Sequence, residues 1–158
     1  MSQCFLWFLI ILALCRICMG HFRIIEEGAF ADFEFEAYGD TLEDLFTVCG
    51  KVMFEVMTDI SKVEPSREMQ FNIKAESVED LLFSFLSELI FLKDTSKYFF
   101  CDFVIEIKER KILHCISRGE PIDRDKHELK TDVKAVTYHK LEIKHNDKGY
   151  HTRVILDL

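Results

Sequence analysis

The chain twice repeats one local order, in which an alternating strand is followed by a capped amphipathic helix. Residues 31–38 (ADFEFEAY) and 69–75 place apolar side chains at every second position, a period that is typical of a half-buried β-strand. After each strand, Thr41 or Ser77 precedes an aspartate by three residues, which resembles a capping box at the start of a helix. The segments that follow carry apolar stripes at helical spacing. Two helices are therefore predicted, over residues 41–57 and 77–91.

Strand-like segments dominate the second half of the chain. The strand candidates cover residues 100–108, 111–118, 133–143 and 149–158, and residues 146–149 form a predicted turn between the last two. Such runs of neighbouring strands favour antiparallel pairing. We therefore predict an α+β fold in which largely antiparallel sheets pack on two amphipathic helices. The 158 residues suffice for one domain with a sizeable core.

The N-terminus carries an apolar run from Phe5 to Cys15. This run is too short for an ordinary transmembrane helix, which needs roughly 20 residues. Its length suits a secretory signal, but its flanks lack both a Lys- or Arg-containing leader and a small-residue cleavage site. Alternatively, the protein begins at Met19. We expect residues 1–18 to be a non-native or unstructured extension and residues 19–158 to form a single domain.

Composition and motifs narrow the classes of function. The net charge of −8 argues against direct binding to nucleic acid or an anionic membrane, because both need a positive surface. Beyond residue 18, Cys49, Cys101 and Cys115 form no C-x-x-C pair, so neither a disulfide framework nor a zinc site is expected. Adjacent His114 and Cys115 would point to opposite faces of a strand. The usual nucleotide-binding, serine-hydrolase and zinc-protease motifs are absent. No catalytic residue is therefore predicted.

Residues 127–143 (HELKTDVKAVTYHKLEI) are unusual for a core strand, because neither face is cleanly apolar. Other distinctive segments accompany them: AYGDTLEDLF at 37–46, MTD at 57–59, VEP at 63–65, LLFSFLSELIFL at 81–92 and the terminal VILDL. In this order and at this spacing, the segments resemble the archease family, small proteins that assist RtcB-type RNA ligases. The resemblance runs from about residue 22 to the last residue. It implies a layered β/α/β sandwich, supports Met19 as the start, and implies a cytoplasmic location.

The resemblance also implies a metal site. The family's H-T-A-D sequence corresponds to residues 29–32, where Ala29 and Phe30 replace the histidine and threonine. The family's metal-binding aspartates correspond to Asp32 and Asp157, and calcium is the expected ion. Leu158 is expected to supply a main-chain or terminal-carboxylate oxygen.

The residues support this implied site independently. Hard cations take oxygen ligands, and strand ends can bring distant carboxylates together. A carboxylate among the apolar neighbours of Asp157 is costly unless it is paired or metal-bound. The replacements at Ala29 and Phe30 bear on the support of the ligands and on affinity.

Lys134 and His139 in the same block are expected to be functional or partner-contacting positions. The resemblance implies a non-catalytic, metal-dependent activator that promotes guanylylation of an RtcB-type ligase by GTP and allows its multiple turnover. One alternative is a small hydrolase or nuclease that uses Asp32 and Asp157 around a metal, with His139 as its only candidate base. Another is a chaperone-like calcium-binding scaffold, secreted if the N-terminal run is a true signal. The expected partner is the ligase, without direct binding of nucleic acid or membrane.

Overall fold

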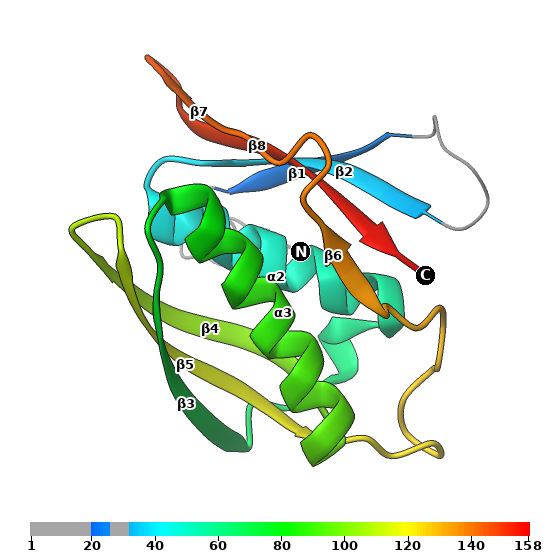
Figure 1. The fold of residues 1–158 in the computed structure, drawn as a ribbon. Coiled ribbons are helices and arrows are strands. Elements are labelled where there is room, and N and C mark those ends of the chain that lie inside the picture. The colour runs from blue at the N-terminus through cyan, green and yellow to red at the C-terminus, as the bar shows by residue number, and fades with distance from the viewer. Residues whose placement is uncertain (1–19, 26–31) are drawn as a thin grey trace, which may run out of the picture.

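Helices α2 (Leu42–Met57) and α3 (Val78–Ser96) lie between two antiparallel β-sheets (Figure 1). This computed structural model describes residues 20–25 and 32–158. The remaining elements are β1 (His21–Ile25), β2 (Asp32–Gly39), the short 3-10 helix η2 (Ile60–Lys62), β3 (Arg67–Lys74), β4 (Tyr98–Lys108), β5 (Ile112–Pro121), β6 (Ala135–Thr137), β7 (Ile143–Asn146) and β8 (Gly149–Asp157). The predicted α+β fold, with antiparallel sheets on two amphipathic helices in a β/α/β sandwich, is confirmed. The predicted extension at residues 1–18 and the positions Ala29 and Phe30 lie outside the described residues.

The larger sheet is built around β8. On one side β8 pairs with β2 along the whole of that strand, from Asp32 opposite Asp157 to Gly39 opposite Tyr150, and β1 pairs with the far side of β2. On its other side β8 pairs with β6 at one end and with β7 at the other. The predicted hairpin turn at residues 146–149 is confirmed, and Gly149 has a positive φ of 107° there, a conformation that favours glycine.

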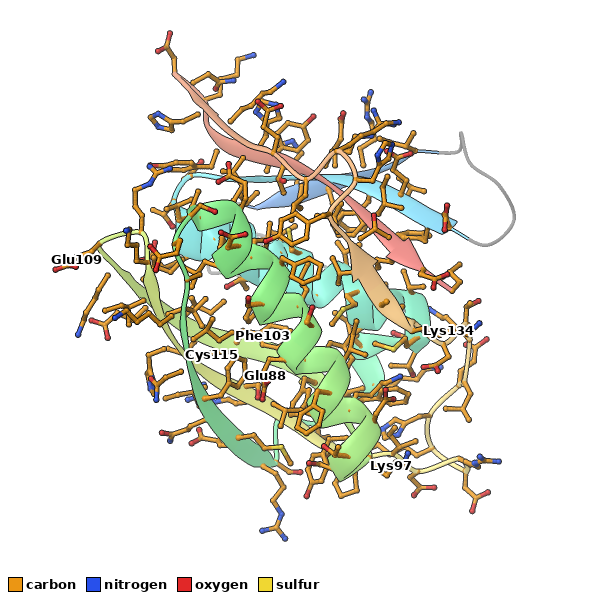
Figure 2. The ribbon with its side chains drawn as sticks, viewed as in Figure 1. Glu88, Lys97, Phe103, Glu109, Cys115 and Lys134 are labelled. Carbon is orange, nitrogen blue, oxygen red and sulfur yellow. The ribbon has the colours of Figure 1, made fainter. Side chains whose placement is uncertain are left out.

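The smaller sheet has the order β3-β5-β4 and covers the opposite side of the helices (Figure 1). Its β4–β5 hairpin ends at Glu109, which Figure 2 shows at the tip, far from the C-terminus. Within this sheet Cys115 is buried, whereas the imidazole of His114 contacts the side chain of Asn72. The two adjacent residues therefore face opposite sides, as predicted. Cys49, Cys101 and Cys115 are free thiols.

Both helices begin where their caps predict. The Thr41 hydroxyl accepts the Asp44 N–H at 3.1 Å, and the Asp44 carboxylate accepts the Thr41 N–H at 3.2 Å. The Ser77 hydroxyl accepts the Asp80 N–H at 3.1 Å. Helix α3 continues past the predicted end at residue 91 to Ser96, and Lys97 closes it in a left-handed conformation. No helix in residues 20–25 and 32–158 is long and apolar enough to span a bilayer.

The prediction of one strand over residues 133–143 is wrong. Strand β6 ends at Thr137, a turn follows in which the Leu141 N–H donates to the Tyr138 carbonyl at 3.1 Å, and β7 begins only at Ile143. Tyr138 leaves the sheet because its ring stacks on Phe83 of α3, with centroids 4.3 Å apart, while its hydroxyl donates to Asp80. Contacts with the start of α3 thus break the strand in two.

Candidate metal and partner site

Asp32 and Asp157 meet at one end of the larger sheet. They are direct cross-strand partners on β2 and β8, and such pairs place their Cβ atoms about 4.5–5.5 Å apart. Their sheet neighbours Phe35 and Leu156 are buried toward the helices, and the alternation of a strand puts both aspartates on the opposite, outer face. Asp32 is exposed and Asp157 is half-buried. The two predicted metal ligands are therefore brought together on an accessible face.

A third strand brings Lys134 and Leu158 to the same place. Strand β6 sets Ala135 opposite Asp157, and the backbone N–H of Lys134 donates to the Asp157 carbonyl at 2.9 Å. The ammonium of Lys134 then donates to the main-chain oxygen of Leu158 at 2.9 Å. Figure 2 shows Lys134 where β6 begins, beside the C-terminal end of β8. Four of the five predicted site residues thus share one corner of the sheet.

The donor set of this corner fits a hard divalent cation. Two like charges directly opposite each other destabilise a strand pair, and a cation between them removes that cost. Carboxylate and main-chain oxygens are the ligands that Ca²⁺ and Mg²⁺ prefer. In the described part of the chain no three His, Cys, Asp or Glu side chains group closely enough to hold a metal. Because Ca²⁺ takes about 6–8 oxygen ligands, water or a partner must supply the rest.

Lys134 constrains how Leu158 could act as a ligand. The main-chain oxygen of Leu158 already accepts a hydrogen bond from the Lys134 ammonium. A cation and an ammonium at the same oxygen repel each other. The oxygen has a second lone pair with which it can coordinate an ion, and this coordination is stronger if Lys134 turns away, for example toward an anionic group on a partner.

His139 does not join this corner. Strand β6 runs antiparallel to β8, with Thr137 opposite Ile155, so the chain moves away from Asp157 as it approaches His139. Two residues further on, His139 lies exposed in the turn after the strand. At about 3.3 Å per residue, the last residue of β6, Thr137, is already roughly 7 Å from the level of Asp157 along the strand. In residues 20–25 and 32–158, no histidine groups with the two aspartates in the way that a metal-dependent hydrolase would need.

A buried lysine that the sequence reading did not single out holds the start of β6. Lys93, only 4% exposed, points from the last turn of α3 to the carboxylates of Asp132 and Asp94 and to the carbonyl of Val133. Burial alone would lower the pKa of Lys93, but the two carboxylates outweigh it and raise that pKa above its ordinary value. A lysine on the apolar stripe of α3, four residues after Leu89, was the available signal.

The rest of the connection between β5 and β6 is anchored at two further points. The Lys130 ammonium caps the C-terminal end of α2 by donating to the carbonyls of Glu55 and Thr58, both at 3.2 Å. Buried His127 accepts the Asp123 N–H on Nδ1, so its Nε2 carries the hydrogen that meets the Glu120 carboxylate at 3.0 Å. These contacts give the residues that precede Lys134 a fixed path across both helix ends.

Glu120 is the acidic centre of that anchor. Burial would raise its pKa, but hydrogen bonds from the Lys126 ammonium, the Glu64 N–H and His127 outweigh burial and lower the pKa to about 2. The Glu64 N–H lies 2.8 Å from the carboxylate, which ties the segment after η2 to the end of β5. Glu120 therefore stays ionised under physiological conditions and supports the fold rather than an acid–base step.

Known proteins resemble this chain in both sequence and fold. The model of the Archease protein family matches residues 22–158. Protein archease of Methanothermobacter thermautotrophicus is 43% identical over 131 residues, which are 81% of this chain and 93% of that protein. Protein archease of Pyrococcus furiosus is 38% identical over 122 residues, 75% of this chain and 86% of its own length. The solution structure of Methanobacterium thermoautotrophicum protein 1598 has 39% identity and a TM-score of 0.75, covering 87% of this chain and 98% of that one. Sequence and fold together show that this chain belongs to the archease family.

Proposed function

We propose that this chain is a non-catalytic, metal-dependent activator of an RtcB-type RNA ligase, working in the cytoplasm. In this role it promotes guanylylation of the ligase by GTP and allows multiple turnover in tRNA splicing. Membership of the archease family supports the proposal, because the family assists such ligases. The observation that carries it is the convergence of Asp32, Asp157, Leu158 and Lys134 at one accessible corner of the larger sheet.

The corner suggests how the chain would act. Asp32 and Asp157 would hold the divalent ion, calcium by expectation, through their carboxylates. When bound, the ion supplies a positive centre that can share oxygen ligands with the partner's nucleotide and metal site. Lys134 keeps the end of β8 in place through Leu158, and its ammonium is close enough to the surface to meet a phosphate or carboxylate instead. Each of these residues binds or orients, and none needs to transfer a proton.

The overall charge suits a protein partner with a basic cleft. The chain carries 28 acidic and 20 basic residues, which disfavours RNA and favours the positive surface that an RNA ligase needs. We therefore propose that the ligase is the partner and that RNA is not bound directly.

The test is a ligase reaction with RtcB-type ligase, GTP, a divalent metal and RNA halves, with and without this protein. We expect faster guanylylation and several turnovers per ligase when the protein is present, and no RNA joining or cleavage by the protein alone. Asp32→Ala and Asp157→Ala should each remove most of the gain. Asp147→Ala, an equal charge change in the exposed β7–β8 turn, should remove none. An unchanged guanylylation rate with the wild-type protein would overturn the proposal, and RNA cleavage without ligase would favour a nuclease.

A further inference from the structure

A pocket of about 430 Å³ lies where α2 and α3 end, beside the connection between β5 and β6. We call it the helix-end pocket. Its apolar lining comes from Met57, Phe99, Ile122 and Leu129, and its free cations are Lys97 and Arg124. The volume falls within the range of about 300–1,000 Å³ that ligand-binding clefts occupy. It is separate from the corner formed by Asp32 and Asp157.

Some of the cations that line the helix-end pocket are paired with carboxylates and others are not. Lys93 and Lys130, which also line it, are engaged by Asp94, Asp132 and Glu55. Lys97 and Arg124 are exposed, and no hydrogen bond or ion pair of their side chains is found within residues 20–25 and 32–158. Asp94 and Asp132 line the pocket as well, so its lining holds four cations against two carboxylates, on a chain whose net charge is −8. Two unneutralised cations beside apolar surface favour a ligand that is both acidic and apolar.

The apolar lining favours a peptide over a nucleotide. Leu129 is 48% exposed, and it lines the pocket together with Met57 and Phe99, which are nearly fully buried. The ring of Phe99 is only 4% exposed and contacts His127 with centroids 5.6 Å apart, so it offers no open face on which a base could stack. Base recognition on protein surfaces relies on such faces. An aliphatic or aromatic side chain, by contrast, needs only the contact area that Leu129 and Ile122 provide.

We propose that the helix-end pocket docks an acidic peptide segment of a partner protein. A bulky apolar side chain of the segment covers Leu129 and Ile122, and flanking carboxylates pair with Lys97 and Arg124. Figure 2 shows Lys97 and Lys134 on the side of the molecule along which the β5–β6 connection runs. From residue 129 to residue 134 the chain spans at most about 18 Å, so one partner can reach both the pocket and the Asp32–Asp157 corner. Only the identification of that partner with the ligase rests on the proposed function.

The first experiment tests the pocket without the ligase. The acetylated peptide EELEE is titrated into the isotope-labelled full chain while methyl signals of Met57, Ile122 and Leu129 are followed by NMR. We expect these signals to shift with EELEE and not with KKLKK or EESEE. The double variant Lys97→Gln/Arg124→Gln should weaken binding about tenfold, because it removes both of the exposed ion pairs that the flanking carboxylates would form. The control Arg67→Gln/Lys74→Gln also removes one arginine and one lysine charge, but from β3, and should leave affinity within about twofold.

The second experiment uses the complete ligase reaction. The Lys97→Gln/Arg124→Gln variant should raise the concentration of protein needed for half-maximal activation about tenfold while leaving the maximal rate unchanged. Leu129→Ser should act in the same direction. Equal binding of KKLKK, or EELEE-induced shifts confined to other residues, would overturn the proposal. Tighter binding of a single-stranded RNA oligonucleotide at the same methyl groups would overturn it too. If the wild-type protein fails to activate the ligase but binds EELEE as expected, the proposed function is wrong and the docking site stands.

Discussion

Asp32 and Asp157 face each other at an open sheet corner, where their like charges repel. A directly opposed pair of like charges costs a strand pair roughly 0.2–1 kcal/mol. Backbone hydrogen bonds among β2, β8 and β6 hold this corner in place, including the bond from the Lys134 N–H to the Asp157 carbonyl. The backbone therefore holds the two carboxylates next to each other even when no cation is bound.

Removing one carboxylate should separate ion binding from folding. We expect Asp157→Asn to weaken calcium binding by about tenfold or more from an already modest Kd of roughly 10⁻⁴–10⁻³ M. Without metal, its melting temperature should be equal to or slightly above that of the wild type, because the repulsion is gone. Calorimetry and thermal denaturation measure the two effects, with Asp147→Asn as the matched control. The same calcium affinity for wild type and Asp157→Asn would refute the site.

Lys134→Ala provides the complementary test at this corner. Loss of the ammonium frees the Leu158 oxygen, so calcium affinity should be retained or increased. Activation of the ligase should nevertheless fall if the lysine meets the partner. A parallel loss of calcium affinity and activation would show instead that Lys134 serves only to hold the ligands.

Glu120 gives the fold a defined acid sensitivity. Its pKa is about 2 in the folded protein against an ordinary 4.5, so its ionised form stabilises the fold fully above pH 4.5, and that stability is lost as the pH falls toward 2. We expect Glu120→Gln to lower the free energy of unfolding at pH 7 and the difference from wild type to shrink below pH 4.5. Chemical denaturation at several pH values measures this. Glu128→Gln, at an exposed glutamate in the connection that follows β5, should show no such trend.

Helix α2 shows how an element can accept a poor residue for the sake of packing. A methyl group on Gly50 would lie 2.9 Å from the Phe103 ring of β4, whose side chain is almost fully buried. Glycine costs a helix about 1 kcal/mol relative to alanine. The close approach of α2 to the smaller sheet is the reason that this cost is accepted.

Gly50→Ala should therefore destabilise the protein although alanine is the better helix former. Overpacking a core typically costs about 1–3 kcal/mol, which exceeds the gain in helix propensity and leaves a net loss on the order of 1 kcal/mol. In a Phe103→Leu background the obstacle is smaller, and the same change should become neutral or stabilising. A double-mutant cycle of unfolding free energies measures this coupling. If Gly50→Ala raised the unfolding free energy of the otherwise wild-type protein, the packing argument would be contradicted.

The elements differ in how far the sequence predicts them. The caps at Thr41 and Ser77 and the alternating segments of β2 and β3 act locally, so residue patterns predict them well. The break between β6 and β7 depends on Tyr138 packing against α3, which is distant in sequence. In the structure the buried positions Val133, Val136 and Leu141 are spaced by three and five residues instead of two. The sequence sign against one strand was that neither face of this segment is cleanly apolar.

For the site, the family resemblance named Asp32, Lys134, Asp157 and Leu158, and the strand register showed that they meet. Composition and periodicity alone could not predict that register, because it depends on which strands pair. The same limit applies to His139, which shares a sequence block with Lys134 but turns away from the corner. Lys93 and the helix-end pocket arise from contacts among α2, α3 and a long connection, and so they required the structure.

At the scale of the whole molecule, the β5–β6 connection links the two sheets across the ends of both helices (Figure 1). Ile122 donates to the carbonyl of Lys97 at the end of α3, Lys130 caps α2, and Lys93 holds Asp132 and Val133 immediately before Lys134. Strand β6 joins the larger sheet directly after this anchored segment. The position of Lys134 therefore depends on the helix layer as well as on its own strand.

Lys93→Met tests this dependence. Methionine fills the buried space of the lysine stem, while Asp94 and Asp132 are exposed and remain solvated, so the overall fold should persist. The start of β6 loses its tether, and we expect faster amide hydrogen exchange across residues 132–137 together with weaker activation of the ligase. Lys108→Met, at an exposed lysine of β4 that pairs with Glu106, should change neither. If amide exchange across β6 is unaltered in Lys93→Met, the backbone hydrogen bonds to β8 fix Lys134 by themselves. Removing the Lys93 contacts would then affect residues only as far as Asp132.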